Sequence, residues 1–183
     1  MVLRSLAAFA RQVHFVEDRA TALERAVDTV HSATGAAWVA AYTPDEAGIF
    51  TRTAAAGEIP FGSPDAAEQD DPALIALRAE RAPIDGPGES MLAGALVLPF
   101  VAAGGITGFL ALGPAAHTYS PGERDALLAV AHTVGLALEV LAARSLRREV
   151  AHLRERAEWA EHELAVMHRV LAQIPAQGAF PAR

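Results

Sequence analysis

Apolar residues recur along this chain with two different periods, which predicts both helices and strands. In Leu3–Val16, and again in residues 21–35, they fall at spacings of three and four, as on one face of a helix. Thr21 and Glu24 match the capping box of a helix start, and Gly35 is a suitable stop. We therefore expect one helix over Leu3–Val16 and a second from about Thr21 to Gly35.

Short apolar runs separated by turn residues predict two β-hairpins. Ala36–Tyr42 and Ile49–Ala55 flank the turn sequence TPDEAG, and Met91–Val101 and Ile106–Leu112 flank a Gly–Gly turn. The stretch Met91–Ala116 has no charge and is long enough to span a bilayer. Its Pro and Gly residues favour two buried strands over a membrane span.

The segment between the hairpins predicts less regular structure. Gly57–Asp71 is rich in Gly, Pro and acidic residues, and we expect a long loop there, either a mobile lid or disordered. Asp71 followed by Pro72 is typical of a helix start, so a short helix is expected over Ala73–Arg81. A brief edge strand is expected at Ala82–Asp85.

The last part of the chain predicts one long helix. Ser120, Pro121 and Glu123 combine a cap, a first-turn Pro and a capping box, and the next Pro is Pro175. A single helix of about 50 residues is the simplest interpretation. Its first half, Ala126–Leu141, is apolar on several sides and is expected to belong to a globular core.

Beyond that half, apolar residues alternate at spacings of four and three, which is the a/d pattern of a coiled coil. The predicted dimerisation seam, which runs on to Ile174, consists of Leu146, Val150, Leu153, Ala157, Ala160, Leu164, Met167 and Leu171. The small Ala157 and Ala160 make its middle thin, and a two-stranded coil does not explain Trp159 at an outer c position.

Charges beside the seam predict the orientation of the pair. In a parallel coiled coil a g residue faces the e residue five places on in the partner helix. Glu149 then meets Arg154, Arg156 meets Glu161, and Glu163 meets His168. We expect a parallel homodimer. The alternative is one amphipathic helix folded back on its own domain, supported by pairs within the helix such as Arg154–Glu158.

Composition excludes several kinds of chemistry. The chain has 183 residues, all 15 basic residues are Arg, and there is no Cys, so disulfides, thiolate metal sites and cysteine nucleophiles are excluded. The net charge is −7, and residues 1–140 hold 8 Arg against 17 acidic residues. An acidic globular part argues against nucleic-acid binding. No signal peptide is recognisable, and we expect a cytoplasmic protein.

The order of elements and two sequence stretches resemble the GAF domain of bacterial signalling proteins. The stretches are LVLPFVAAGGITGFLALG at 96–113 and YSPGERDALLAVAHTVGLALE at 119–139. The resemblance implies an α+β fold with a central antiparallel sheet of five or six strands flanked by helices, the first and last helices on one face. We expect a GAF-like domain over 1–141, a coiled-coil helix over 142–175 and a flexible tail over 176–183.

The resemblance also implies a small-molecule pocket on the opposite face of the sheet. Family members that attach a bilin through Cys, or reduce methionine sulfoxide with catalytic Cys, do not fit a chain without Cys. Cyclic-nucleotide binders carry a Lys-containing motif that this Lys-free chain lacks. The ligand-contact candidates are Trp38, Tyr42, Phe50, Arg52, Arg78 and His117, and ordinary core packing or a solvated surface are the competing interpretations.

No constellation of catalytic or metal-binding residues is visible. Ser120 is expected to be a helix cap and not a nucleophile. The His residues are scattered along the chain, and His117 and His132 would be the first candidates for ligands of a metal or haem. We expect no metal and no cofactor.

We therefore expect a non-enzymatic sensory or regulatory module that binds a small ligand or partner and signals as a parallel homodimer. The alternative is a ligand-free dimerisation scaffold with a degenerate pocket. Beyond itself, the expected partners are an unknown small molecule and an output or membrane sensor domain outside this chain.

Overall fold

The computed structural model describes residues 8, 16, 18–60, 64–102 and 105–173, with side chains as far as Val170. The chain divides into two compact units, Met1–Leu141 and Ala142–Arg183. Each unit is described by itself. The helix expected over Leu3–Val16 lies outside the described residues, apart from Ala8, which is helical, and Val16, which is buried.

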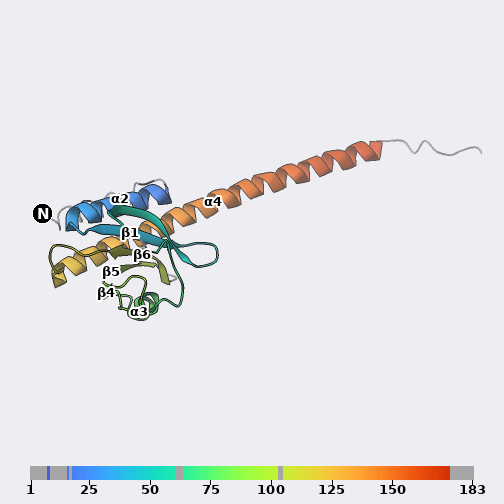
Figure 1. The fold of residues 1–183 in the computed structure, drawn as a ribbon. Helices are drawn as coiled ribbons and strands as arrows, with labels where there is room; N and C mark the ends of the chain where they lie inside the picture. The colour runs from blue at the N-terminus through green and yellow to red at the C-terminus, as the bar shows by residue number, and fades with distance from the viewer. Residues whose placement is uncertain (1–7, 9–15, 17, 61–63, 103–104, 174–183) are drawn as a thin grey trace, which may run out of the picture. The chain divides into compact units, whose positions relative to one another are not determined.

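The first unit is built around a six-stranded sheet with the order β3-β2-β1-β6-β5-β4 (Figure 1). Every strand pair in it is antiparallel, which confirms the expected α+β fold. The strands are β1 (Trp38–Pro44), β2 (Phe50–Gly57), β3 (Ala66–Ala67), β4 (Ile84–Asp85), β5 (Leu96–Ala102) and β6 (Gly105–Leu112). The helices are α2 (Arg19–Thr34), α3 (Pro72–Glu80) and α4 (Pro121–Gln173).

Helix α2 begins earlier than the sequence pattern predicts. Its N-cap is Asp18, whose carboxylate accepts hydrogen bonds from the Thr21 backbone N–H (2.8 Å) and the Thr21 hydroxyl (2.7 Å). The predicted cap at Thr21 is therefore wrong, because Thr21 is already helical and its hydroxyl serves the true cap. The predicted stop is confirmed, since Gly35 adopts the left-handed conformation that ends many helices.

The strands β1, β2 and β6 begin and end within two residues of their predicted bounds, and the largest difference is at the start of β5. Strand β5 begins at Leu96 and not at Met91, because Gly94 has a positive φ of 74° and its N–H bonds back to the Gly86 carbonyl. A residue in that conformation cannot continue an extended strand. The predicted loop Gly57–Asp71 contains the short strand β3, which pairs with β2. The edge strand predicted at Ala82–Asp85 is confirmed as β4.

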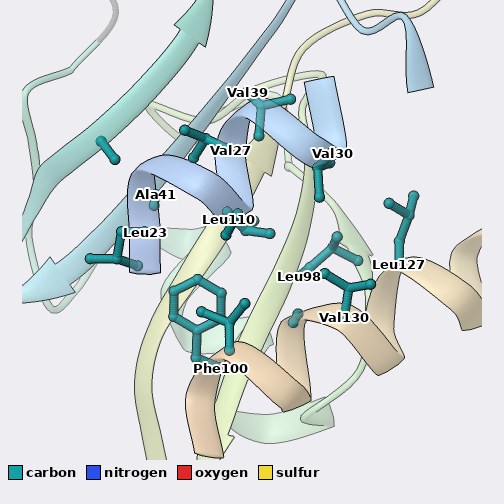
Figure 2. Packing of buried hydrophobic residues seen from close by; sticks show 14 of the residues in the cluster. Leu23, Val27, Val30, Val39, Ala41, Leu98, Phe100, Leu110, Leu127 and Val130 are labelled. Atoms are coloured by element: carbon teal, nitrogen blue, oxygen red, sulfur yellow. The ribbon is translucent and has the colours of Figure 1, made fainter. Parts of the chain in front are cut away.

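Two separate clusters of buried side chains cover the two faces of the sheet. Helices α2 and α4 pack on one face, where Leu23 and Val27 of α2 meet Leu98, Leu110 and residues of α4 (Figure 2). Helix α3 covers the other face, which we call the α3 face. Alternation along each strand decides which cluster a side chain joins. In β1, Val39 and Ala41 belong to the first cluster, while Ala40 and Tyr42 belong to the second.

Helix α4 begins and extends as predicted. The Ser120 and Glu123 backbone and side-chain groups bond reciprocally, as in a capping box. By length and composition, α4 includes a stretch apolar enough to cross a membrane. Core helices pass the same test, and side chains such as Leu127 and Val134 of this stretch are buried in the core of the first unit.

Candidate functional site

The α3 face brings together five of the six predicted ligand-contact residues. Tyr42 and Phe50 belong to its buried cluster, and Trp38 packs against that cluster. Arg52 lies opposite Tyr42 in the β1–β2 pairing, and Arg78 comes from α3. Strand alternation places Trp38, Ala40 and Tyr42 on this one face of the sheet.

Stacked aromatic rings fill the centre of this face. The Tyr42 ring stacks on the Phe109 ring with centroids 4.8 Å apart, and the Phe50 ring lies 5.5 Å from Phe109 at a tilt. The Tyr42 hydroxyl donates a hydrogen bond to the Pro64 carbonyl at 2.9 Å. Burial raises the pKa of Tyr42, and the nearby Arg52 guanidinium partly opposes this rise. In this conformation the aromatic side chains therefore fill the face of the sheet on which the family resemblance implies a ligand pocket.

Both candidate cations are already held by the chain segment before α3. Arg52 forms an ion pair with Asp65, and its backbone N–H donates to the Asp65 carbonyl at 2.7 Å. The Nη1 atom of Arg52 is buried and has no hydrogen-bond partner among the described residues. Arg78 lies over the Phe50 ring and donates to the Gln69 carbonyl at 2.6 Å. Residues 64–69 thus supply the acceptors that an anionic ligand would otherwise offer.

A buried polar cluster fixes α3 over this face. The Asp71 carboxylate accepts hydrogen bonds from the Ala73 N–H (2.8 Å), the Ser90 hydroxyl (2.6 Å) and the Met91 N–H (3.0 Å). Asp71 is therefore both the predicted helix cap and a link to the segment before β5. The sequence pattern predicts only the first role, because the second depends on a residue 19 positions away.

Trp38 occupies the far end of β1 from this ring stack. Its indole packs against Gly113, where an added Cβ atom would clash with the indole nitrogen. Trp38 is half-buried, so the structure assigns it a packing contact with the end of β6.

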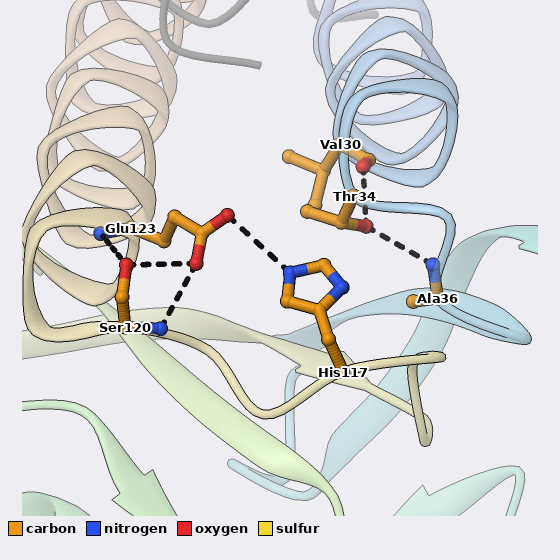
Figure 3. Close-up of polar contacts among 6 residues, drawn as sticks. All are labelled: Val30, Thr34, Ala36, His117, Ser120 and Glu123. Carbon is orange, nitrogen blue, oxygen red and sulfur yellow. Dashed lines mark hydrogen bonds and ion pairs between the residues drawn. The ribbon is translucent and has the colours of Figure 1, made fainter.

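The sixth candidate, His117, lies apart from the other five. Its Nε2 atom is 3.3 Å from a Glu123 carboxylate oxygen at the start of α4 (Figure 3). The Ser120 hydroxyl and N–H also bond to Glu123, at 2.8 and 2.9 Å. Hydrogen bonds from Ser120, chiefly that of its N–H, lower the pKa of Glu123, and His117 adds to this effect. This arrangement makes Ser120 a helix cap, as predicted.

Sequence reasoning missed Phe109, Asp65 and Gln69. Phe109 belongs to the quoted stretch at 96–113, but only the pairing of β1 with β6 places it opposite Tyr42. Among the described residues, no group of three or more His, Asp or Glu side chains is arranged to hold a metal ion.

The predicted dimerisation seam is an exposed stripe in the second unit. Every seam residue whose side chain is described is exposed in the single chain, and Leu153, for example, is 53% exposed. The described seam residues are Leu146, Val150, Leu153, Ala157, Ala160, Leu164 and Met167, while the side chain of Leu171 lies outside the description. Trp159, 68% exposed, stands beside this stripe.

Comparison with known proteins identifies a family. The sequence model of the GAF domain matches residues 18–138. No curated protein matches the chain significantly. The second GAF domain of DevS from Mycobacterium smegmatis is 27% identical with a TM-score of 0.57, and the match covers 72% of this chain and 99% of that one.

Two more distant structures share the fold. The GAF domain of an Acinetobacter phosphoenolpyruvate-protein phosphotransferase is 15% identical with a TM-score of 0.63, covering 77% of this chain and 94% of that one. The free methionine-R-sulfoxide reductase from Neisseria meningitidis is 16% identical with a TM-score of 0.62, covering 76% of this chain and 89% of that one. The fold thus occurs in signalling proteins and in an enzyme, and does not by itself decide between these roles.

Proposed function

The chain belongs to the GAF domain family, and from this premise we propose that it is a non-enzymatic regulatory module that signals as a parallel homodimer. The observation that carries the proposal is the exposed apolar stripe of α4. Large apolar side chains in heptad register, such as Leu146, Leu153 and Leu164, are exposed to solvent in one chain. Burying them against a second copy recovers about 25 cal/mol for each Å² of apolar surface.

The sensory part of the proposal concerns the α3 face. A small ligand there would compete with residues 64–69 for Arg52 and Arg78. Strand β3 ties that segment to β2 over only two residue pairs. Ligand binding would then bias two arrangements of this segment, and the dimer would carry the change to a partner domain.

A second candidate function is a ligand-free dimerisation scaffold. The observation in its favour is the filled α3 face, where the rings of Tyr42, Phe50 and Phe109 are buried and in contact. A face filled by side chains has no room for a ligand, so the function of the domain would then be dimerisation.

Native mass spectrometry of the freshly purified protein, followed by thermal unfolding, separates these two candidates. For the sensor, we expect a dimer with a discrete additional mass, and a melting temperature that falls when that mass is removed. A dimer without added mass, and with no shift in melting temperature across a panel of small carboxylates, phosphates and aromatic compounds, would favour the scaffold.

Cysteine cross-linking tests the parallel pairing directly, since the chain has no Cys of its own. In a parallel, in-register pair, Leu153 at d faces its symmetry mate. We expect Leu153→Cys to form a covalent dimer in high yield under mild oxidation, measured by non-reducing electrophoresis. Glu155→Cys is the matched control, because the f position two residues on points away from the partner.

An antiparallel pair or a helix folded back on its own domain would leave Leu153→Cys uncross-linked. Equal yields from Leu153→Cys and Glu155→Cys would indicate random collision and would also contradict the proposal.

A further inference from the structure

Both candidate cations of the α3 face are paired with acceptors of one short chain segment. The Arg52 guanidinium binds the Asp65 carboxylate, and Arg78 donates to the Gln69 carbonyl. The Arg52 backbone N–H also donates to the Asp65 carbonyl. A surface that offers donors and positive charge, and that meets a carboxylate of its own chain, is complementary to an anion.

The ion pair with Asp65 uses only half of the Arg52 guanidinium. One carboxylate oxygen of Asp65 contacts Nη2, while Nη1 is buried and has no hydrogen-bond partner in the part of the chain that the structure describes. A buried donor without an acceptor is costly. A carboxylate with two free oxygens can bind both nitrogens of a guanidinium side by side. Such a carboxylate would satisfy the atom that Asp65 leaves unpaired.

The fold holds the two members of this pair to different degrees. The Arg52 side chain is 23% exposed, and its backbone lies in the pairing of β2 with β1. The Asp65 side chain is 85% exposed, and the adjacent strand β3 pairs with β2 over only two residue pairs. An ion pair with so exposed a carboxylate contributes little to stability. The Asp65 carboxylate can therefore leave at small cost while the guanidinium stays in place.

We propose that Arg52 is the binding residue for a small organic carboxylate, and that Asp65 is an internal competitor that occupies Arg52 when this ligand is absent. The inference rests on the sensory part of the proposed function and names its ligand class. The free carboxylate binds Nη1 and Nη2 together, and the Asp65 side chain moves into solvent. The chemical class follows from Asp65, whose carboxylate already contacts Nη2.

Internal competition lowers the apparent affinity for the ligand without changing the site. The apparent dissociation constant is the intrinsic one divided by the fraction of molecules in which Arg52 is free. If Asp65 occupies Arg52 in about nine molecules of ten, the constant rises about tenfold. Each ligand that binds also releases Asp65, which couples ligand binding to the segment 64–69 beside β2.

Acetate is the probe, because it is equivalent to the Asp side chain detached from its backbone. The full chain carrying Asp65→Ala is titrated with sodium acetate, and sodium chloride keeps the ionic strength constant. The amide signals of Arg52 and its neighbours in two-dimensional proton–nitrogen NMR report binding. We expect Asp65→Ala to bind acetate at least about tenfold more tightly than the wild-type chain. The double variant Asp65→Ala with Arg52→Gln is expected to show no saturable binding.

A second Arg–Asp pair of the first unit supplies the matched control. Arg124 of α4 donates to both carboxylate oxygens of Asp85, at 2.8 and 3.1 Å, and the two side chains are about as exposed as those of the first pair. Among the described residues, Arg124 has no buried nitrogen without a partner. We therefore expect no saturable acetate binding by Asp85→Ala.

Folding of the variants is checked by circular dichroism. Asp65 and Asp85 are both exposed, so their replacement is not expected to disturb the fold. Should Asp65→Ala unfold, Asp65→Asn repeats the titration, because it removes the charge and keeps the size of the side chain.

The outcomes separate this inference from the proposed function. Equal acetate affinity in the wild-type chain and in Asp65→Ala would overturn Asp65 as the internal competitor. Absence of saturable binding in Asp65→Ala, or equally tight binding in Asp85→Ala, would overturn Arg52 as a carboxylate site. The sensory proposal is decided separately, since it fails when native mass spectrometry and the thermal panel find no ligand of any class.

Discussion

Replacing Leu153 and Leu164 together by Asp is expected to convert the dimer to a monomer and raise its dissociation constant by at least about a thousandfold. Each Leu contributes on the order of 1.5–3 kcal/mol when buried, and each occurs twice in the dimer. The Asp side chains add two pairs of like charges in the seam, where desolvation makes them costly. Sedimentation velocity over a range of protein concentrations measures the change.

The matched control places the same two charges on the outside of the helix. Ala151 and Ala165 occupy b positions, so Ala151→Asp with Ala165→Asp is expected to keep the dimer. If the Leu153 and Leu164 variant also remained dimeric, the seam would not hold the pair together. The interpretation of an amphipathic helix folded back on its own domain would then gain support.

Replacing Phe109 by Ala is expected to cost the first unit about 3–5 kcal/mol of unfolding free energy. The Phe109 side chain is fully buried, and its ring contacts those of Tyr42 and Phe50. Removing it creates a cavity and deletes two aromatic pairs at once. Urea unfolding followed by circular dichroism measures the loss.

The surface of α3 supplies the control for this variant. Ile75 is 56% exposed, so Ile75→Ala is expected to change the unfolding free energy by less than about 0.5 kcal/mol. A loss below about 1 kcal/mol for Phe109→Ala would mean that the α3 face is loosely packed. Such a face would have room for a ligand, and the scaffold interpretation would lose its main support.

Much of the fold follows from local patterns. Strand alternation around Ala40, the helix start at Ser120 and the stop at Gly35 each depend on residues a few positions apart. Such signals are contained in short stretches of sequence, which is why the order of elements and the long helix were predicted. The start of α2 is an exception, because the capping-box pattern selected Thr21 as the N-cap. In the structure Asp18 is the N-cap, and its carboxylate accepts hydrogen bonds from the Thr21 N–H and the Thr21 hydroxyl.

The candidate site was predicted less completely. Tyr42, Phe50, Arg52 and Arg78 were identified one by one, and the structure brings them together with Trp38 on the α3 face. Their partners in the segment 64–69 could not be identified, because no periodic pattern connects Tyr42 with a carbonyl 22 residues away. His117 was grouped with these residues but lies beside Glu123, since the loop after β6 directs it to the start of α4.

By itself, the sequence determined the element order and the heptad of α4, because each depends on side chains that recur at fixed short spacings, and its resemblance to the GAF domain implied the α+β class. The tertiary structure alone decided which side of each element is covered. It placed Phe109 against Tyr42 through the pairing of β1 with β6. It also buried Leu127 and Val134 of α4 while leaving Leu136 of the same helix exposed. Burial depends on contacts between distant segments, and local periodicity carries no information about which segments meet.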